Sequence, residues 1–373
     1  AMRADYGQVV LEAPLCAALR RINPRLPETA IEEALRKVLG LPHLHPGLVA
    51  NNRAFHRCLT DGVDVEYRAA DGRIVGDKAW LVDFEHPERN EFLAVNQFTV
   101  IENQHHRRPD VVIFVNGLPV VVIELKNPAD ENATIEKAYR QIQTYQREIP
   151  ALFAYNEIVV ISDGVDARAG SLTAPWERMM PWRTIEGEEL APAWLPRGEV
   201  LARGMLAHNR LLDLLRSFIV FEEVDGVVTK KLAAYHQFHA VNRAVETTIE
   251  AAASDHRAGV VWHTQGSGKS LTMVFFAGKI ILHPKMHNPT LVVITDRNDL
   301  DGQLFGTFAA CQAALRQTPA QAEDREDLQR LLAVASGGVV FSTIQKFLPE
   351  KGQAYPTLST RSNIVVIADE AHR

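Results

Sequence analysis

The sequence predicts an α/β protein with two domains, the first built on a mixed sheet and the second on a parallel sheet. Three observations carry this prediction. Residues 107–128 form an apolar hairpin pattern that three charged side chains interrupt. Residues 259–273 predict an apolar strand, a glycine-rich turn and a helix start, the order that phosphate-binding loops require. Residues 363–373 form a second apolar run that ends in adjacent carboxylates.

Composition limits the classes of protein that the chain can be. Its 373 residues, 46% hydrophobic and 23% charged, suffice for two or three globular domains. No apolar run approaches membrane-span length and no signal peptide is present, which predicts a cytoplasmic protein without membrane contact. Three scattered cysteines without a CxxC pair indicate neither a zinc site nor disulfides. The net charge of −6 restricts DNA binding to local patches, such as residues 105–108, or to partner subunits.

The first domain is expected to span residues 1–228. Residues 27–39 predict a helix, with acids in the first turn and bases near the end. Glu32 or Glu33 could add a metal ligand, although surface acids that match the helix dipole are the simpler interpretation. The other predicted elements are strands at 62–67, 73–84, 91–101 and 157–164, a loop-rich segment at 165–200, and a helix followed by an apolar run at 205–221.

The central feature of this domain is the hairpin RRPDVVIFVNGLPVVVIELKNP, residues 107–128, whose Asn-Gly pair predicts the turn. Asp110 opens one arm, while Glu124 and Lys126 share a face of the other. Two carboxylates beside an ammonium on a buried sheet are unfavourable unless they bind something, and Mg²⁺ fits them. Lys126 would then stabilise a phosphate or orient water. The alternative is a hairpin with solvated charges at its ends.

The register of the hairpin decides whether a metal can bind. A plain two-residue turn would place Asp110 opposite Ile123, on the other face from Glu124. An extra residue near Leu118–Pro119 would restore a shared face, and proline favours such an irregularity because it cannot donate to a ladder. The metal hypothesis therefore requires a bulge near the turn, and it includes the backbone carbonyl of Leu125 as a further ligand.

Pro109-Asp110 followed by Glu124-Leu125-Lys126 resembles the PD-(D/E)xK signature of a large nuclease superfamily. Gln141 and Tyr145 follow as a QxxxY pair on one helix face, a spacing that alone also fits an amphipathic helix. With NNRAFHRCL, NQFTV, ISDG, MPWRT and YHQFHAV, these motifs resemble the restriction subunit of type I restriction–modification enzymes over nearly the whole chain. The resemblance implies catalytic roles for Asp110, Glu124, Lys126, Gln141 and Tyr145, with a metal on Asp110 and Glu124.

The second domain is expected to span residues 229–373 and to contain the phosphate loop GVVWHTQGSGKSLTM. Gly266 and Gly268, with Ser267 between them, let backbone N–H groups approach phosphates. His263 stands where the strict pattern has glycine, a departure that fits the helicase variants of this loop.

Two further groups complete the predicted ATP site. Lys269 would reach the β- and γ-phosphates of ATP, and Ser270 would bind Mg²⁺. Asp369 and Glu370 end the apolar run and resemble the Walker B motif of superfamily 2 helicases. Asp369 would hold Mg²⁺ through water, and Glu370 would polarise the hydrolytic water.

The helix YHQFHAVNRAVE precedes this loop. Its Gln237 lies at the distance where related helicases carry a glutamine that reads adenine. His236 and His239 are three apart, but no third metal ligand is evident, so surface histidines are the simpler interpretation. Strand-like runs at 290–295 and 339–347 predict a parallel sheet with helices on both faces, the first RecA-like half of a helicase motor.

The resemblance implies ATP-driven translocation of double-stranded DNA coupled to Mg²⁺-dependent cleavage of unmodified DNA away from the recognition site. No target-recognition or methyltransferase motif is evident, so specificity would come from modification and specificity subunits. The alternative enzyme is a DNA-repair helicase–nuclease of superfamily 2. A non-enzymatic DNA clamp is disfavoured because every catalytic position is filled.

The sequence stops directly after the Walker B motif, so we expect the N-terminal portion of a longer subunit. Residues 1–373 alone should bind ATP–Mg²⁺ weakly without appreciable DNA-stimulated hydrolysis. The reason is that an arginine finger, which the second RecA-like domain supplies, contributes roughly 10³–10⁵ in rate. Phosphate release with and without duplex DNA measures this, and strong DNA stimulation would contradict the assignment.

Overall fold

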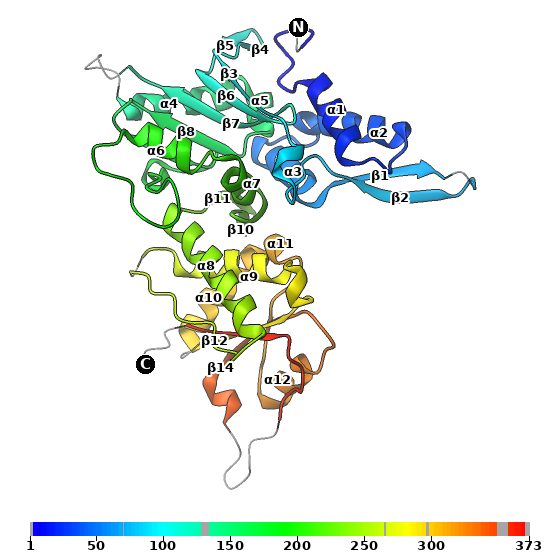
Figure 1. Ribbon diagram of the computed structural model, residues 1–373, viewed down its shortest axis with the longest axis vertical. Coiled ribbons are helices and arrows are strands. Elements are labelled where there is room, and N and C mark those ends of the chain that lie inside the picture. The colour runs from blue at the N-terminus through cyan, green and yellow to red at the C-terminus, as the bar shows by residue number, and fades with distance from the viewer. Residues whose placement is uncertain are drawn as a thin grey trace. The chain divides into compact units, whose positions relative to one another are not determined.

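The computed structural model describes residues 3–69, 71–127, 134–264, 266–295, 298–348 and 357–369. Two compact units divide the chain, one of Ala1–Ile219 with Val228–Tyr235 and one of Val220–Val227 with His236–Arg373 (Figure 1). The predicted division after residue 228 falls in the hairpin of β10 (Ile219–Val224) and β11 (Val227–Leu232), and it stays a prediction. Among the described residues, no helix has the length and apolar character needed to cross a membrane.

A five-stranded mixed sheet forms the centre of the first unit. Its order is β3 (Phe92–Asn96), β6 (Val111–Val115), β7 (Leu118–Leu125), β8 (Ile158–Ser162) and β9 (Ala167–Gly170). Only β7 and β8 pair in parallel. All five residues of β8 are buried, as expected for a strand covered on both faces. Helix α4 (Ile135–Glu148) packs on β7 and β8 (Figure 1). The predicted mixed sheet with flanking helices is confirmed.

The other helices of this unit follow from apolar residues at helical spacing. Helix α2 (Glu28–Leu39) forms where the sequence predicts it and buries Ala30, Ile31, Ala34 and Val38 on one face. The remaining helices are α1 (Glu12–Ile22), α3 (Leu48–Asp61), α5 (Pro150–Ala154), α6 (Arg197–Gly204) and α7 (His208–Ser217), with 3₁₀ turns at Leu41–His43, Pro87–Arg89 and Trp176–Arg178.

Two predicted strands of this unit are shorter than expected. Strand β2 ends at residue 79, within the predicted 73–84, and pairs with β1 to form a separate hairpin. The predicted strand 91–101 is interrupted because Gln97 has a positive φ of 52°, which ends β3. These short elements are β1 (Val63–Arg68), β2 (Ile74–Ala79), β4 (Val100–Glu102) and β5 (His105–Arg107).

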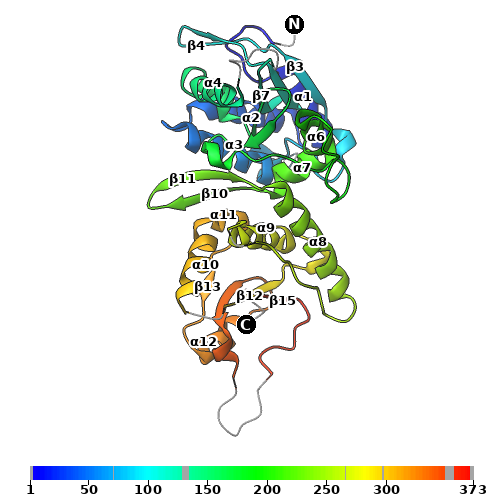
Figure 2. The same ribbon diagram turned by 90° about the vertical axis from the view of Figure 1, so that its left-hand side faces the viewer.

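The second unit contains a four-stranded parallel sheet, of which Figure 2 labels β12, β13 and β15. The strand order is β13 (Ala320–Gln321), β14 (Val339–Thr343), β12 (Thr290–Thr295) and β15 (Ile364–Ala368). Val340 packs with Leu328 of α12 (Arg325–Leu332), while Phe341 meets Phe308 of α10 (Asn298–Ala310) edge-on. Neighbouring strand residues point to opposite faces, so these two helices cover both faces as predicted. The other helices are α8 (Tyr235–Ala252), α9 (Lys269–Ile281) and α11 (Gln312–Leu315), with 3₁₀ turns at Pro284–Met286 and Ile344–Phe347.

The strand predicted from the apolar residues before the phosphate loop is wrong. Residues 259–264 form no strand, and Val260 and Trp262 are 86% and 90% exposed. A strand needs a pairing partner, and β15 pairs with β12 alone among the described residues. Val366 of β15 is 57% exposed, so apolar surface stays open on both segments.

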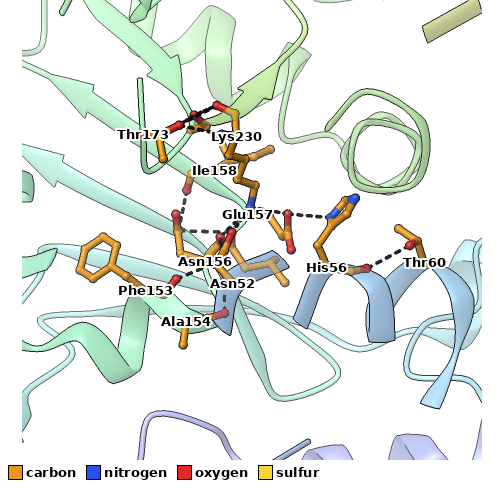
Figure 3. A network of polar contacts seen from close by, with 12 residues as sticks. Asn52, His56, Thr60, Phe153, Ala154, Asn156, Glu157, Ile158, Thr173 and Lys230 are labelled. Carbon is orange, nitrogen blue, oxygen red and sulfur yellow. Dashed lines mark hydrogen bonds and ion pairs between the residues drawn. The ribbon is translucent and has the colours of Figure 1, made fainter. Parts of the chain in front are cut away.

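A buried ion pair lies in the interior of the first unit (Figure 3). Lys230 of β11 and Glu157 have fully buried side chains, and Lys230 Nζ lies 2.6 Å from Glu157 Oε2. The same ammonium donates to Asn52 Oδ1 at 2.8 Å and to the Asn156 carbonyl at 3.0 Å. His56 Nδ1 lies 3.0 Å from Glu157 Oε2. Burial alone would raise the pKa of the Glu157 carboxyl, but Lys230 and His56 hold it below its ordinary value.

Candidate functional site

A bulge in the β6–β7 hairpin brings the predicted carboxylates to one face. The pairing runs Val115–Leu118 and Phe114–Pro119, then shifts so that Ile113 faces Val121 and Val111 faces Ile123. Val120 is therefore the extra residue, next to the position where the sequence requires an irregularity. Continuing this register places Asp110 opposite Glu124, and the expected bulge is confirmed.

The turn and the bulge each have a local cause. Asn116 and Gly117 both have positive φ, as a two-residue hairpin turn requires. A Cβ on Gly117 would lie 2.4 Å from the carbonyl oxygen of Leu11, so no larger residue fits there. The bulged Val120 keeps a bonded carbonyl, because the Glu157 N–H donates to it at 2.8 Å.

The Asp110 carboxylate is held by two uncharged donors. The Leu125 backbone N–H donates to Oδ2 at 2.8 Å, and the Gln97 amide donates to Oδ1 at 2.7 Å. Gln97 is not among the candidate site residues that the sequence predicts. The signal for it was a polar residue within the motif NQFTV, directly after an apolar strand.

Glu124 is the buried carboxylate of the pair, 4% exposed. Its Oε1 accepts from Lys126 Nζ at 2.7 Å, while its Oε2 is buried without a hydrogen-bond partner of ordinary geometry among the described residues. Burial raises the pKa of this carboxyl, Lys126 lowers it, and the nearby Asp110 charge raises it further. A buried carboxylate beside a second carboxylate, whose charges burial disfavours, is the environment that a cation stabilises.

Helix α4 brings the QxxxY pair to the same place. Tyr145 is 5% exposed, and burial together with the charge of Glu124 raises the pKa of its phenol. Gln141, one turn earlier, lies close enough to lower that pKa by hydrogen bonding. The phenol therefore stays protonated at neutral pH, next to Glu124. The structure thus brings Asp110, Glu124, Lys126, Gln141 and Tyr145 together.

These residues fit a hard divalent cation. Mg²⁺ characteristically uses one or two carboxylates and keeps several waters. Asp110 and Glu124 supply two carboxylates, and the buried Glu124 Oε2 is an acceptor that a cation could bind. Within the described ranges, no cluster of three or more histidine, cysteine, aspartate and glutamate residues could hold a metal. Glu33, one of the two helix acids considered as a further ligand, is bonded instead to Lys37 and to the backbone of Glu66.

The phosphate loop leads directly into α9. Gly266 and Gly268 have φ of 81° and 84°, conformations that glycine adopts without strain. Lys269 is the first residue of α9 and Ser270 the second, so both lie in the first helical turn. The N–H groups of such a turn have no helical partner and can bind phosphate.

Helix α8 is fastened to this loop. Gln237 is 5% exposed, and its amide donates to the Gly268 carbonyl and to Thr272 Oγ1, both at 3.2 Å. His236 Nε2 lies 3.3 Å from the carbonyl oxygen of Ser267, and its ring meets His263 edge-on. His236 is therefore half-buried against the loop, and the interpretation of His236 and His239 as surface histidines rather than metal ligands stays a prediction.

The Walker B residues are only partly described. Asp369 follows β15, and its N–H donates to the Ile294 carbonyl of β12 at 2.9 Å. Glu370 lies outside the described residues. A carboxylate directly after a parallel strand, in the same sheet as β12, is the placement that the sequence predicts for Asp369.

Fold and site together define a nuclease-type mixed-sheet domain followed by a P-loop ATPase domain. Residues 1–178 match the family model of the type I restriction enzyme R protein N terminus, and residues 236–373 match that of SWI2/SNF2 ATPases. The chain is related to the endonuclease subunits of type I restriction enzymes and corresponds to their N-terminal portion.

Three curated relatives illustrate this kinship. The HindI endonuclease subunit of Haemophilus influenzae is 46% identical over all of this chain, which covers 36% of that subunit. The putative MjaIXP endonuclease subunit of Methanocaldococcus jannaschii is 34% identical over all of this chain, which covers 37% of that subunit. The SauMSSORF170P endonuclease subunit of Staphylococcus aureus is 29% identical over 76% of this chain, and the match covers 29% of that subunit. The chain therefore spans between 29% and 37% of the length of these relatives.

Proposed function

We propose that this chain supplies the nuclease site and the first ATP-binding domain of a type I restriction enzyme. The complete enzyme would use ATP to translocate double-stranded DNA and would cleave unmodified DNA away from its recognition site. The observation that carries the proposal is the bulged hairpin, which sets Asp110 opposite Glu124 with Lys126 bonded to Glu124. The kinship with restriction endonuclease subunits supports it.

Each residue of the nuclease site has a proposed task. Asp110 and Glu124 would hold Mg²⁺, which when bound supplies Lewis acidity and an activated water. The Lys126 side chain is 22% exposed, so its ammonium can contact an incoming phosphate while it stays bonded to Glu124. Tyr145 keeps its proton and can donate to Glu124 or to a phosphate, and Gln141 orients the phenol.

The second unit would bind ATP and Mg²⁺. Gly266, Ser267, Gly268 and Lys269 would bind the phosphates, and Ser270 and Asp369 would bind the metal. Gln237 is proposed to sense the nucleotide, since its amide is already bonded to the loop at Gly268. Glu370 would polarise the hydrolytic water. The partners of the complete enzyme would be duplex DNA and the modification and specificity subunits, in the cytoplasm.

The metal step can be tested on this chain alone. Asp110→Asn and Glu124→Gln should each weaken Mn²⁺ binding at least about 10-fold, because each removes a charged ligand from a two-carboxylate site. Titration followed by electron paramagnetic resonance, without nucleotide, measures the change. Glu33→Gln is the matched control, because its carboxylate is already bonded to Lys37. Unchanged binding in both site variants would remove the metal from the proposal.

A superfamily 2 repair helicase–nuclease is the competing assignment. It would use the same two units but would cut DNA without stalled translocation. The single variants Lys126→Ala and Lys269→Ala, compared in DNA cleavage and in ATP hydrolysis, separate the two.

A further inference from the structure

Gln97 occupies an unusual place at the end of β3. The β3–β6 ladder ends at the pair Asn96–Val111, and the next backbone bond runs from the Gln97 N–H to the Asp110 carbonyl at 2.7 Å. The following N–H, of Phe98, donates to the Pro109 carbonyl at 3.1 Å. The chain therefore stays fastened to the residues around Asp110 after regular pairing has stopped.

The backbone at Gln97 is strained. Its φ of 52° lies in the left-handed region, which residues with a side chain rarely adopt. Such a conformation persists only where the surroundings enforce it. Phe98 does so from one side, because it is 3% exposed and its ring meets Phe114 of β6 edge-on. In this conformation the Gln97 side chain reaches the Asp110 carboxylate.

The Gln97 side chain provides the second of two hydrogen bonds that hold the Asp110 carboxylate. Its amide nitrogen donates to Oδ1 at 2.7 Å, while the Leu125 N–H donates to Oδ2 at 2.8 Å. The two donors come from segments flanking the hairpin arm, so the carboxylate cannot rotate without losing one of them. Neither donor is charged, so neither competes with a cation for the negative charge of Asp110. Each oxygen also keeps a second lone pair for a ligand bond.

We propose that Gln97 is a positioning residue of the metal centre, which holds the Asp110 carboxylate in the orientation that binds a hard divalent cation. The inference rests on the proposed function, because it needs Asp110 to be a metal ligand. Gln97 itself is exposed, so its bond to Asp110 adds little to folding. A positioning role therefore predicts a loss of metal affinity with nearly unchanged stability, whereas a purely structural role predicts the reverse.

The test compares Gln97→Leu with two references in Mn²⁺ titrations of the chain without nucleotide or DNA. Removal of an outer partner of a metal ligand weakens binding roughly 10–100-fold, and we expect this loss for Gln97→Leu, with an unchanged urea midpoint. Gln104→Leu is the matched control, because Gln104 is also an exposed glutamine with positive φ, at 71° in the β4–β5 turn. It should bind Mn²⁺ like the wild type. Gln97→Asn keeps the amide on a shorter side chain, and it should still bind Mn²⁺ more weakly than the wild type.

The reference variant Asp110→Asn distinguishes failure of the positioning role of Gln97 from failure of the metal site itself. If Asp110→Asn weakens binding while Gln97→Leu binds like the wild type, the positioning role is wrong and the metal site stands. If Asp110→Asn leaves Mn²⁺ binding unchanged, the metal site and the role of Gln97 both fail. A loss of affinity in Gln97→Leu that is matched by a large fall in the urea midpoint would also overturn the positioning role.

Discussion

In the full-length subunit within its complex, Lys126→Ala should abolish DNA cleavage while ATP hydrolysis continues. Lys126 is bonded to Glu124 in the proposed nuclease site, so its loss would remove the cation that we propose acts on the DNA phosphate. Loss of one such preorganised group lowers catalysis by about 10²–10³. The phosphate loop lies in the other unit and stays unchanged. Supercoiled-plasmid cleavage, measured beside phosphate release, tests the separation.

Lys269→Ala is the second variant of this test, and it removes the predicted phosphate-binding lysine of the ATP site. Lys269 begins α9 directly after the phosphate loop, and its removal should stop ATP turnover. In a type I enzyme, cutting depends on translocation, so Lys269→Ala should also stop cleavage although Asp110, Glu124 and Lys126 are intact. Wild-type cutting by Lys269→Ala would favour a repair helicase–nuclease instead. Loss of ATP hydrolysis in Lys126→Ala would show that the two sites are not separable.

Lys230→Met should destabilise the first unit by about 3–5 kcal/mol, because it leaves Glu157 charged, buried and without its ammonium. Glu157 also bonds Val120, the bulged residue that sets Asp110 opposite Glu124, so loss of this network should disturb the metal site as well. Urea unfolding followed by tryptophan fluorescence suits the measurement, since four of the five tryptophans precede residue 219.

Two controls make this prediction specific. Lys78→Met makes the same chemical change at the Lys78–Asp64 pair, whose side chains are 40% and 75% exposed, and should cost at most about 1 kcal/mol. The double variant Lys230→Met with Glu157→Gln removes both buried charges and should recover part of the loss. Equal effects at the buried and surface pairs would contradict the role given to the Lys230–Glu157 pair.

The nuclease hairpin was predictable because its signals are local. The Asn-Gly pair fixed the turn, and a shared face for Asp110 and Glu124 required an irregularity that the structure places at Val120. The exact bulge position was not predictable. It depends on the Glu157 N–H, which comes from a segment beyond α4 and satisfies the Val120 carbonyl.

Other features depend on contacts that no local pattern reveals. The N-cap residues of helices α1 and α3 are Leu11 and Gly47, which form no side-chain cap, so the strongest start signal is missing from the sequence. The strand expected at 259–264 was wrong because apolar residues form a strand only beside a partner. Gln97 became visible only when β3 and β6 were paired, since its bond to Asp110 joins residues thirteen apart in sequence.

The central claim is that Asp110 and Glu124 form one metal centre in a bulged hairpin. Anomalous diffraction from crystals of the chain grown with Mn²⁺ tests it most directly. The account predicts a manganese peak that both carboxylates contact, with the carbonyl of Leu125 as a third protein ligand and Lys126 beside it. A structure without manganese between Asp110 and Glu124, or with the two carboxylates on opposite faces of the hairpin, would contradict it.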